Sequence, residues 1–162
     1  MKDVALVISS GGARGLAAIG VIEELEARGY NITSIAGSSI GSAIGGIYAS
    51  GCLEQYKEWI CSLEKMDVLK LMDFTISRNG FLKGVKVFRE MSQFFKDRNI
   101  EDLSIPYAAV SVDLITHQQV VFKSGSLYAA IRASCSIPSL IQPSNIKGKV
   151  LIDGCLLYTS DA

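Results

Sequence analysis

The strongest indication of the fold is a pattern that occurs twice in the first third of the chain. A short apolar run is followed by a glycine-rich turn and then by apolar residues at helical spacing. The first occurrence joins residues 4–8 to residues 16–25, and the second joins residues 34–36 to residues 40–49. Strands that alternate with helices in this way predict an α/β domain built on a parallel sheet.

The rest of the chain continues this alternation. Helical spacing predicts further helices over residues 53–72, 85–95 and 128–134, with a turn signal at Asn79-Gly80. β-forming residues predict strands over residues 107–112, 119–122 and 150–152, with a loop over residues 113–118. We therefore expect a three-layer α/β/α domain with a largely parallel central sheet.

Composition disfavours several functions. The 162 residues include 16 basic and 16 acidic side chains that are scattered along the chain, so no charged face is expected to attract nucleic acid. No apolar run approaches the roughly 20 residues of a membrane-spanning helix. The apolar run at the N-terminus is too short for a secretory signal, so we expect a cytoplasmic protein. The four cysteines form no C-x-x-C pair, which predicts free thiols.

The turn after the second apolar run carries a candidate nucleophile. Gly37-Ser38-Ser39-Ile40-Gly41 fits the G-x-S-x-G pattern of a nucleophile elbow, in which Gly37 and Gly41 permit a sharp turn from strand to helix. The pattern alone is weak, but here it follows a predicted strand and opens a predicted helix, whose N-terminus stabilises developing negative charge. We therefore predict that Ser39 is the nucleophile and that its hydroxyl is exposed.

The turn after the first apolar run is a candidate anion-binding loop. The glycines of residues 10–15 let backbone N–H groups approach an anion closely. Ser10 occupies the first glycine position of a dinucleotide-binding fingerprint, and the Gly-Lys pair of a Walker loop is missing, which disfavours nucleotide binding. The other interpretation is an oxyanion hole, in which backbone N–H groups contact a carbonyl oxygen as it gains charge. The candidate donors are Gly11, Gly12, Ala13 and Arg14.

Asp153 is the candidate base. It directly follows a predicted strand, and open α/β sheets gather their active groups at the carboxyl ends of strands. Asp153-Gly154 is also a common turn sequence, and Asp113 is a rival acid at another strand end. The lone histidine, His117, lies in a predicted loop and is interpreted as a solvated turn residue. A Ser-His-Asp triad is therefore not expected.

Four segments together resemble the patatin-like phospholipase family, and their order and placement match it over nearly the whole chain. They are the glycine loop at residues 11–15, the turn centred on Ser39, residues 130–138, and Asp153-Gly154. The resemblance implies a lipid acyl hydrolase with a Ser39–Asp153 dyad, no histidine, and an oxyanion hole in the glycine loop. It also implies lipid or lysolipid substrates, transient contact with a membrane surface, and neither a cofactor nor a metal.

Three positions depart from the family pattern. Ser10 stands where glycine is usual, Ala18 stands where histidine is common, and Cys155 follows Asp153-Gly154 where glycine or alanine is expected. The last eight residues, 155–162, resemble one translated frame of a transposon-type sequencing adapter. We therefore expect residues 1–154 to form a patatin-like domain that is incomplete at its C-terminus, followed by a non-native tail.

Two other functions are compatible with the sequence. A patatin-like protein could bind or regulate lipids without turnover, although the presence of both Ser39 and Asp153 argues against this. An α/β-hydrolase esterase could have lost its histidine with a missing C-terminus, because that fold runs in the order Ser, acid, His. The glycine loop directly after the first strand favours the patatin arrangement.

Overall fold

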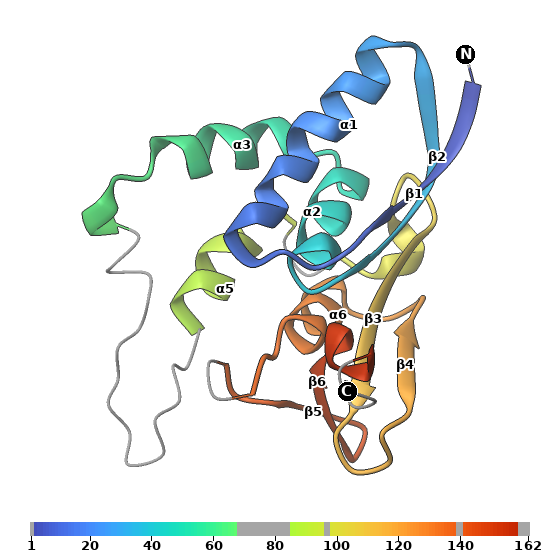
Figure 1. The fold of residues 1–162 in the computed structure, drawn as a ribbon, viewed down its shortest axis with the longest axis vertical. Helices are drawn as coiled ribbons and strands as arrows, with labels where there is room; N and C mark the ends of the chain where they lie inside the picture. The colour runs from blue at the N-terminus through green and yellow to red at the C-terminus, as the bar shows by residue number, and fades with distance from the viewer. Residues whose placement is uncertain (1, 68–84, 96–97, 139–140, 159–162) are drawn as a thin grey trace.

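A computed structural model describes residues 2–67, 85–95, 98–138 and 141–158 (Figure 1). Its strands are β1 (Lys2–Ile8), β2 (Tyr30–Ser38), β3 (Tyr107–Asp113), β4 (Gln119–Phe122), β5 (Ser144–Ile146) and β6 (Lys149–Asp153). Its α-helices are α1 (Ala17–Ala27), α2 (Ile40–Ala49), α3 (Leu53–Ser62), α5 (Val85–Ser92) and α6 (Leu127–Ser134). Short 3-10 helices are η1 (Gly12–Leu16), η2 (Ile100–Asp102) and η3 (Gly154–Tyr158).

The strands form one mixed sheet. β1, β2 and β3 are parallel neighbours, as the alternation of strands and helices predicts. β4 and β6 pair antiparallel with β3, and β5 pairs antiparallel with β6. Short connections join β3 to β4 and β5 to β6, which favours antiparallel pairing, whereas β4, α6 and β5 lie between β3 and β6 along the chain. Lys147 and Gly148, between β5 and β6, both have positive φ, which is typical of a tight hairpin turn.

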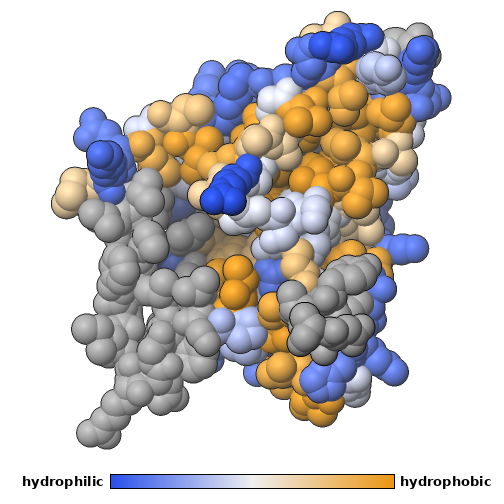
Figure 2. Space-filling model, viewed as in Figure 1, coloured by the Kyte–Doolittle hydropathy of each residue, from blue (hydrophilic) through white to orange (hydrophobic). Residues whose placement is uncertain are grey.

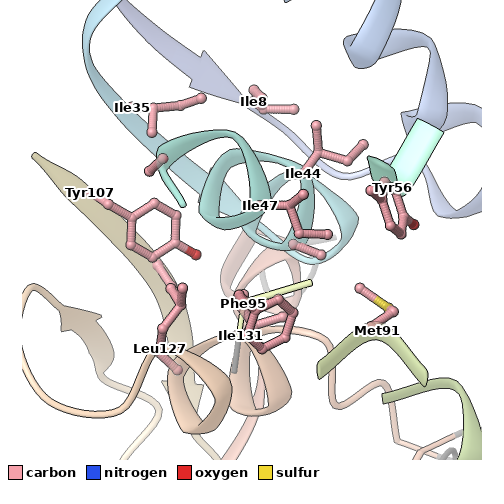
Figure 3. Close-up of a cluster of buried hydrophobic side chains, with 14 of the residues drawn as sticks. Ile8, Ile35, Ile44, Ile47, Tyr56, Met91, Phe95, Tyr107, Leu127 and Ile131 are labelled. Atoms are coloured by element: carbon pink, nitrogen blue, oxygen red, sulfur yellow. The ribbon is translucent and has the colours of Figure 1, made fainter. Parts of the chain in front are cut away.

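The helices gather on one face of the sheet (Figure 1). α1 packs against β2, α2 packs against β2 and β3, and α6 packs against β3 and β6. Between them lies a core of buried apolar side chains (Figure 3), among them Ile35, Ile44, Ile47, Tyr107 and Ile131. Because α2 is surrounded by this core, it fixes the position of the turn that precedes it.

On the opposite face of the sheet, η3 packs against β3 and β4. Val7 on β1 is 77% exposed there. A cavity of about 540 Å³ runs along this face, with Ala5, Ala36 and Ala108 in its lining. In Figure 2, hydrophobic surface lies at the upper right, over β1, β2 and α1. The α-helices of the described residues thus form one layer on the sheet, whereas the alternation of strands and helices predicts a layer on each face.

Most predicted elements are confirmed, with two differences. The helix predicted over residues 53–72 is interrupted, because α3 ends at Ser62 and Leu63 has an extended backbone. Residues 65–67 are again helical, and residues 68–72 lie outside the described residues. The predicted turn at Asn79-Gly80 lies outside the described residues. β5 was not predicted, since three residues are too few to show a periodic pattern. Within the residues that the structure describes, no helix is both long enough and apolar enough to cross a membrane.

Candidate active site

Ser39 lies at the junction between β2 and α2. Its backbone has φ 55° and ψ −132°, a conformation that few residues other than glycine adopt. A side chain at Gly37 would overlap the backbone of Gly41, and one at Gly41 would overlap the carbonyl of Ile8. The turn therefore requires glycine on both sides of Ser39, in agreement with the spacing of the sequence pattern.

Ser39 is more buried than the sequence predicts, because only 4% of the residue is exposed. Two elements close over the turn. η1 packs against the first turn of α2, where a side chain at Gly15 would overlap Ile40. From the other side, Ser134 at the end of α6 contacts the backbone of Ser39.

Asp153 meets this turn because β2 and β6 lie end to end along the same edge of β3. β2 pairs with the first part of β3, up to Val110, and β6 pairs with the last part, from Ser111. β4 pairs with residues of both parts, so it occupies the opposite edge. β2 and β6 run in opposite directions, so their carboxyl ends face each other. Ser38 and Asp153 therefore lie opposite consecutive residues of β3.

Contacts beyond the strands bring the two ends still closer. Ser38 Oγ lies 3.1 Å from Cys155 Sγ. A side chain at Gly154 would overlap the carbonyl of Val110 and approach Ser38 Oγ to 2.7 Å. Glycine at position 154 thus lets the residues after β6 pass directly over the end of β2.

The Asp153 carboxylate is buried, and only one of its two oxygens has a hydrogen-bond partner among the described residues. The residue is 2% exposed, and its Oδ1 accepts a hydrogen bond from the backbone N–H of Cys155 at 2.9 Å. Its Oδ2 is buried without a hydrogen-bond partner among the described residues. Buried carboxylate oxygens are nearly always paired, so an unpaired one calls for an explanation. Among the same residues, no hydrogen bond joins Asp153 to Ser39.

The predicted oxyanion loop lies beside the elbow. Its residues 11–14 are exposed, and Gly12 has φ 52°, which favours glycine. The backbone N–H of Arg14 donates to the carbonyl of Gly11 at 3.0 Å, so this amide is already occupied. η1 begins at Gly12, and the first N–H groups of a helix have no partner within the helix. Gly12 and Ala13 are therefore better placed as donors than Arg14.

The rival acid and the histidine occupy the β3–β4 connection. Asp113 Oδ1 accepts a hydrogen bond from the backbone N–H of Ile115 at 3.0 Å, and this bond lowers the pKa of the Asp113 carboxyl. Asp113 thus stabilises its own turn. His117 is exposed with φ 56°, and its N–H donates to the carbonyl of Asp113. The prediction that His117 is a solvated turn residue is confirmed.

Several buried polar side chains around the elbow were not assigned a role from the sequence. Ser42 Oγ donates to the carbonyl of Ser39 at 2.6 Å, and Tyr107 Oη donates to the carbonyl of Ser42 at 2.7 Å. Ser134 and Ser136 are fully buried at the end of α6. The sequence feature that could have indicated them is the presence of serines inside otherwise apolar segments. Such serines are expected to be buried and therefore to need hydrogen-bond partners.

The surroundings of the site are mostly apolar. A cavity of about 390 Å³ adjoins the elbow, lined by the ends of β1 and β2 together with Val110, Gly154 and Cys155. Burial raises the pKa of the Cys135 thiol to about 12, so this group stays neutral at physiological pH. In the part of the chain that the structure describes, no cluster of three or more His, Cys, Asp or Glu could bind a metal ion.

Comparison with known proteins gives a consistent result. The family model described as patatin-like phospholipase matches residues 6–161. The chain is 46% identical over 154 residues to an uncharacterized NTE family protein of Mycobacterium bovis, covering 95% of this chain and 43% of that protein. It is 35% identical over 162 residues to patatin-like phospholipase domain-containing protein 6 of Mus musculus, covering 94% of this chain and 12% of that protein.

The fold is similar to that in the crystal structure of VipD from Legionella pneumophila. The TM-score is 0.59 at 18% sequence identity, and the similarity covers 96% of this chain and 46% of that one. Fold and site together define a mixed α/β domain with a serine at a strand-to-helix turn and an aspartate beside it. The chain belongs to the patatin-like phospholipase family. It spans less than half the length of these relatives.

Proposed function

We propose that this chain is a serine hydrolase acting on carboxylic esters of lipids, with Ser39 as nucleophile and Asp153 as general base. The single observation that supports this most directly is the buried, unpaired Oδ2 of Asp153 at the strand end that faces the elbow. A free carboxylate lone pair in an apolar setting is what a serine hydroxyl needs in order to lose its proton. Family membership supports lipid esters as the substrate class.

The reaction proceeds in two halves. Ser39 Oγ bonds to the ester carbonyl carbon while its proton passes to Asp153 Oδ2. The carbonyl oxygen becomes an oxyanion that the N–H groups of Gly12 and Ala13 stabilise. The alcohol then leaves with the proton from Asp153. In the second half, water attacks the acyl-enzyme, Asp153 takes its proton, and the carboxylic acid departs as Ser39 regains a hydrogen.

The site favours a lipid acyl group over a polar one. The cavity beside the elbow has apolar residues of β1 and β3 in its lining, including Val7 and Val110. Burial of apolar surface stabilises binding by about 25 cal/mol per Å² removed from water. A short acyl chain of a phospholipid or lysophospholipid would gain from this, and substrate entry would involve transient contact with a membrane surface.

The test is covalent labelling with a fluorophosphonate, which bonds to activated serines. The purified protein is expected to be labelled, and Ser39→Ala is expected to remove all labelling and all hydrolysis of p-nitrophenyl esters while the circular dichroism spectrum stays unchanged. Ser38→Ala is the matched control, because it removes a neighbouring hydroxyl that contacts Cys155. Labelling of Ser39→Ala at the wild-type rate would refute the proposal.

A second candidate function is lipid binding without turnover. It is favoured by the missing hydrogen bond between Ser39 and Asp153 among the described residues and by the burial of Ser39. The same experiment separates the two functions. A protein that binds fluorescent lysolipid but is not labelled and hydrolyses neither p-nitrophenyl esters nor a panel of phospholipids and lysophospholipids is a binding protein.

A further inference from the structure

We infer that Ser134 is a positioning residue for the nucleophile, and that the end of α6 fixes Ser39 and Asp153 relative to each other. The inference rests on the proposed function. It starts from the backbone of Ser39, whose φ of 55° is unfavourable for serine. Such a conformation persists only where the surrounding structure determines it.

The peptide groups of Ser39 are anchored on both sides. The carbonyl accepts hydrogen bonds from Ser42 Oγ at 2.6 Å and from the Ser42 N–H at 2.9 Å, both within α2. The N–H donates to Ser134 Oγ at 3.0 Å, across 95 residues of sequence. Among the described residues, this is the hydrogen bond that ties the nucleophile's backbone to an element other than its own strand and helix.

The hydroxyl of Ser134 can act in this bond only as an acceptor. A serine hydroxyl carries one hydrogen, and Ser134 Oγ donates it to the carbonyl of Val110 on β3 at 2.5 Å. The remaining lone pairs then face the Ser39 N–H. Because Ser134 is fully buried, water does not compete for either bond. Ser134 therefore links the elbow directly to the strand along which β2 and β6 meet.

The same segment also anchors the base. Two residues after Ser134, the carbonyl of Ser136 accepts a hydrogen bond from the backbone N–H of Asp153 at 2.9 Å. Ser136 Oγ receives a hydrogen bond from Arg132 Nη1 at 2.7 Å, and the Arg132 guanidinium stacks 5.1 Å above the ring of Phe88. The turn at the end of α6 thus binds the backbone of nucleophile and base through residues that are two positions apart.

This arrangement makes proton transfer sensitive to Ser134. If the Ser39 N–H loses its partner, the strained turn can relax, and Oγ moves relative to Asp153 Oδ2. If losing a buried hydrogen bond destabilises the transition state by the free energy of that bond, the reaction rate falls about tenfold. Substrate binding is not expected to change, since Ser134 lies behind the turn and does not line the cavity beside it.

The test compares Ser134→Ala with Ser50→Ala in the 162-residue chain. Ser50 is a buried serine at the other end of α2 whose hydroxyl donates to the carbonyl of Gly46 at 2.7 Å, so its loss is a matched structural change far from the elbow. Ser134→Cys, which retains the shape and weakens the hydrogen bond, is measured alongside in case Ser134→Ala does not fold.

Two readouts decide the outcome. By NMR, exchange of the Ser39 amide proton is expected to accelerate at least tenfold in Ser134→Ala, less in Ser134→Cys, and not in Ser50→Ala. For p-nitrophenyl ester hydrolysis, kcat is expected to fall about tenfold in Ser134→Ala with KM unchanged within twofold. Unchanged exchange at Ser39, an unchanged kcat, or an equal loss in Ser50→Ala would overturn the inference. A wild-type protein without labelling or turnover would instead refute the proposed function, and amide exchange would still decide the anchoring role.

Discussion

At the scale of single residues, the site is defined by one carboxylate oxygen. Asp153 uses Oδ1 to accept the N–H of Cys155, and this bond orients the carboxylate. Oδ2 stays unpaired in a buried position. Asp113, by contrast, accepts hydrogen bonds from Ile115 and Thr116 in its own turn, and these bonds lower the pKa of its carboxyl. The contrast between the two acids supports the proposal that Asp153 is the general base.

Replacing Asp153 by Asn is expected to lower kcat at least 100-fold, within the range that loss of a general base produces. The fold is expected to persist, because the amide oxygen can still accept the Cys155 N–H. Turnover of a p-nitrophenyl ester measures the effect, and circular dichroism monitors the fold.

Two controls accompany this variant. Asp113→Asn and His117→Asn are each expected to change turnover less than threefold. Asparagine is chosen at position 117 because it tolerates the positive φ found there. A loss in Asp113→Asn equal to that in Asp153→Asn would contradict the assignment of the base, and a 100-fold loss in His117→Asn would indicate a triad.

At the scale of elements, the glycines of the two turns let helices and strands approach closely. Gly41 in the first turn of α2 lies against the carbonyl groups of Ile8 and Ser9 at the end of β1. Gly20 in α1 has no neighbour within 4 Å of the position that a side chain would occupy. The two glycines share helical geometry and differ only in what surrounds them.

Gly41→Ala is therefore expected to destabilise the protein by more than about 2 kcal/mol, because the added methyl group overlaps a backbone that cannot move aside. Gly20→Ala is expected to stabilise it by about 0.5–1 kcal/mol, since alanine favours helix more than glycine does. Urea denaturation measures both free energies of unfolding. If the two variants have equal stability, β1 and α2 can move apart to accommodate the added methyl group, which contradicts the prediction.

The elements were largely predictable from the sequence, and the contacts between them were not. The start and end of α2 follow from the glycines and apolar spacing of residues 37–51, as predicted. The end-to-end meeting of β2 and β6 depends on β3, which lies about 70 residues from β2 along the chain, and no local pattern encodes it. For the same reason, the hydrogen bond from Ser39 to Ser134 could not be predicted, although both serines are prominent in the sequence.

At the scale of the whole molecule, the sheet has one covered face and one open face. The open face bears small and apolar side chains, of which Val7 is 77% exposed. Relatives of this chain are more than twice as long. We propose that residues 1–154 form a patatin-like domain whose open face is covered by further polypeptide in a longer form of the protein. An open apolar face of this kind favours self-association.

Val7→Lys is expected to reduce self-association, because it places a charge among the exposed apolar side chains of the open face, on the edge strand β1. Size-exclusion chromatography over a range of protein concentrations measures the effect. Ile115→Lys is the matched control, since Ile115 is 69% exposed in the β3–β4 connection, away from that face. An equal effect of both variants would show that net charge, and not the open face, determines association.

The backbone conformation of Ser39 has a consequence for evolution under heat. A residue held at positive φ lowers the stability of the fold by about 1–3 kcal/mol, and glycine there would relieve most of it. Selection for thermal tolerance alone would then favour Ser39→Gly, a chain that melts at a higher temperature and lacks the proposed nucleophile. Retention of serine at this position in a heat-selected library would therefore indicate that selection was also acting on chemistry.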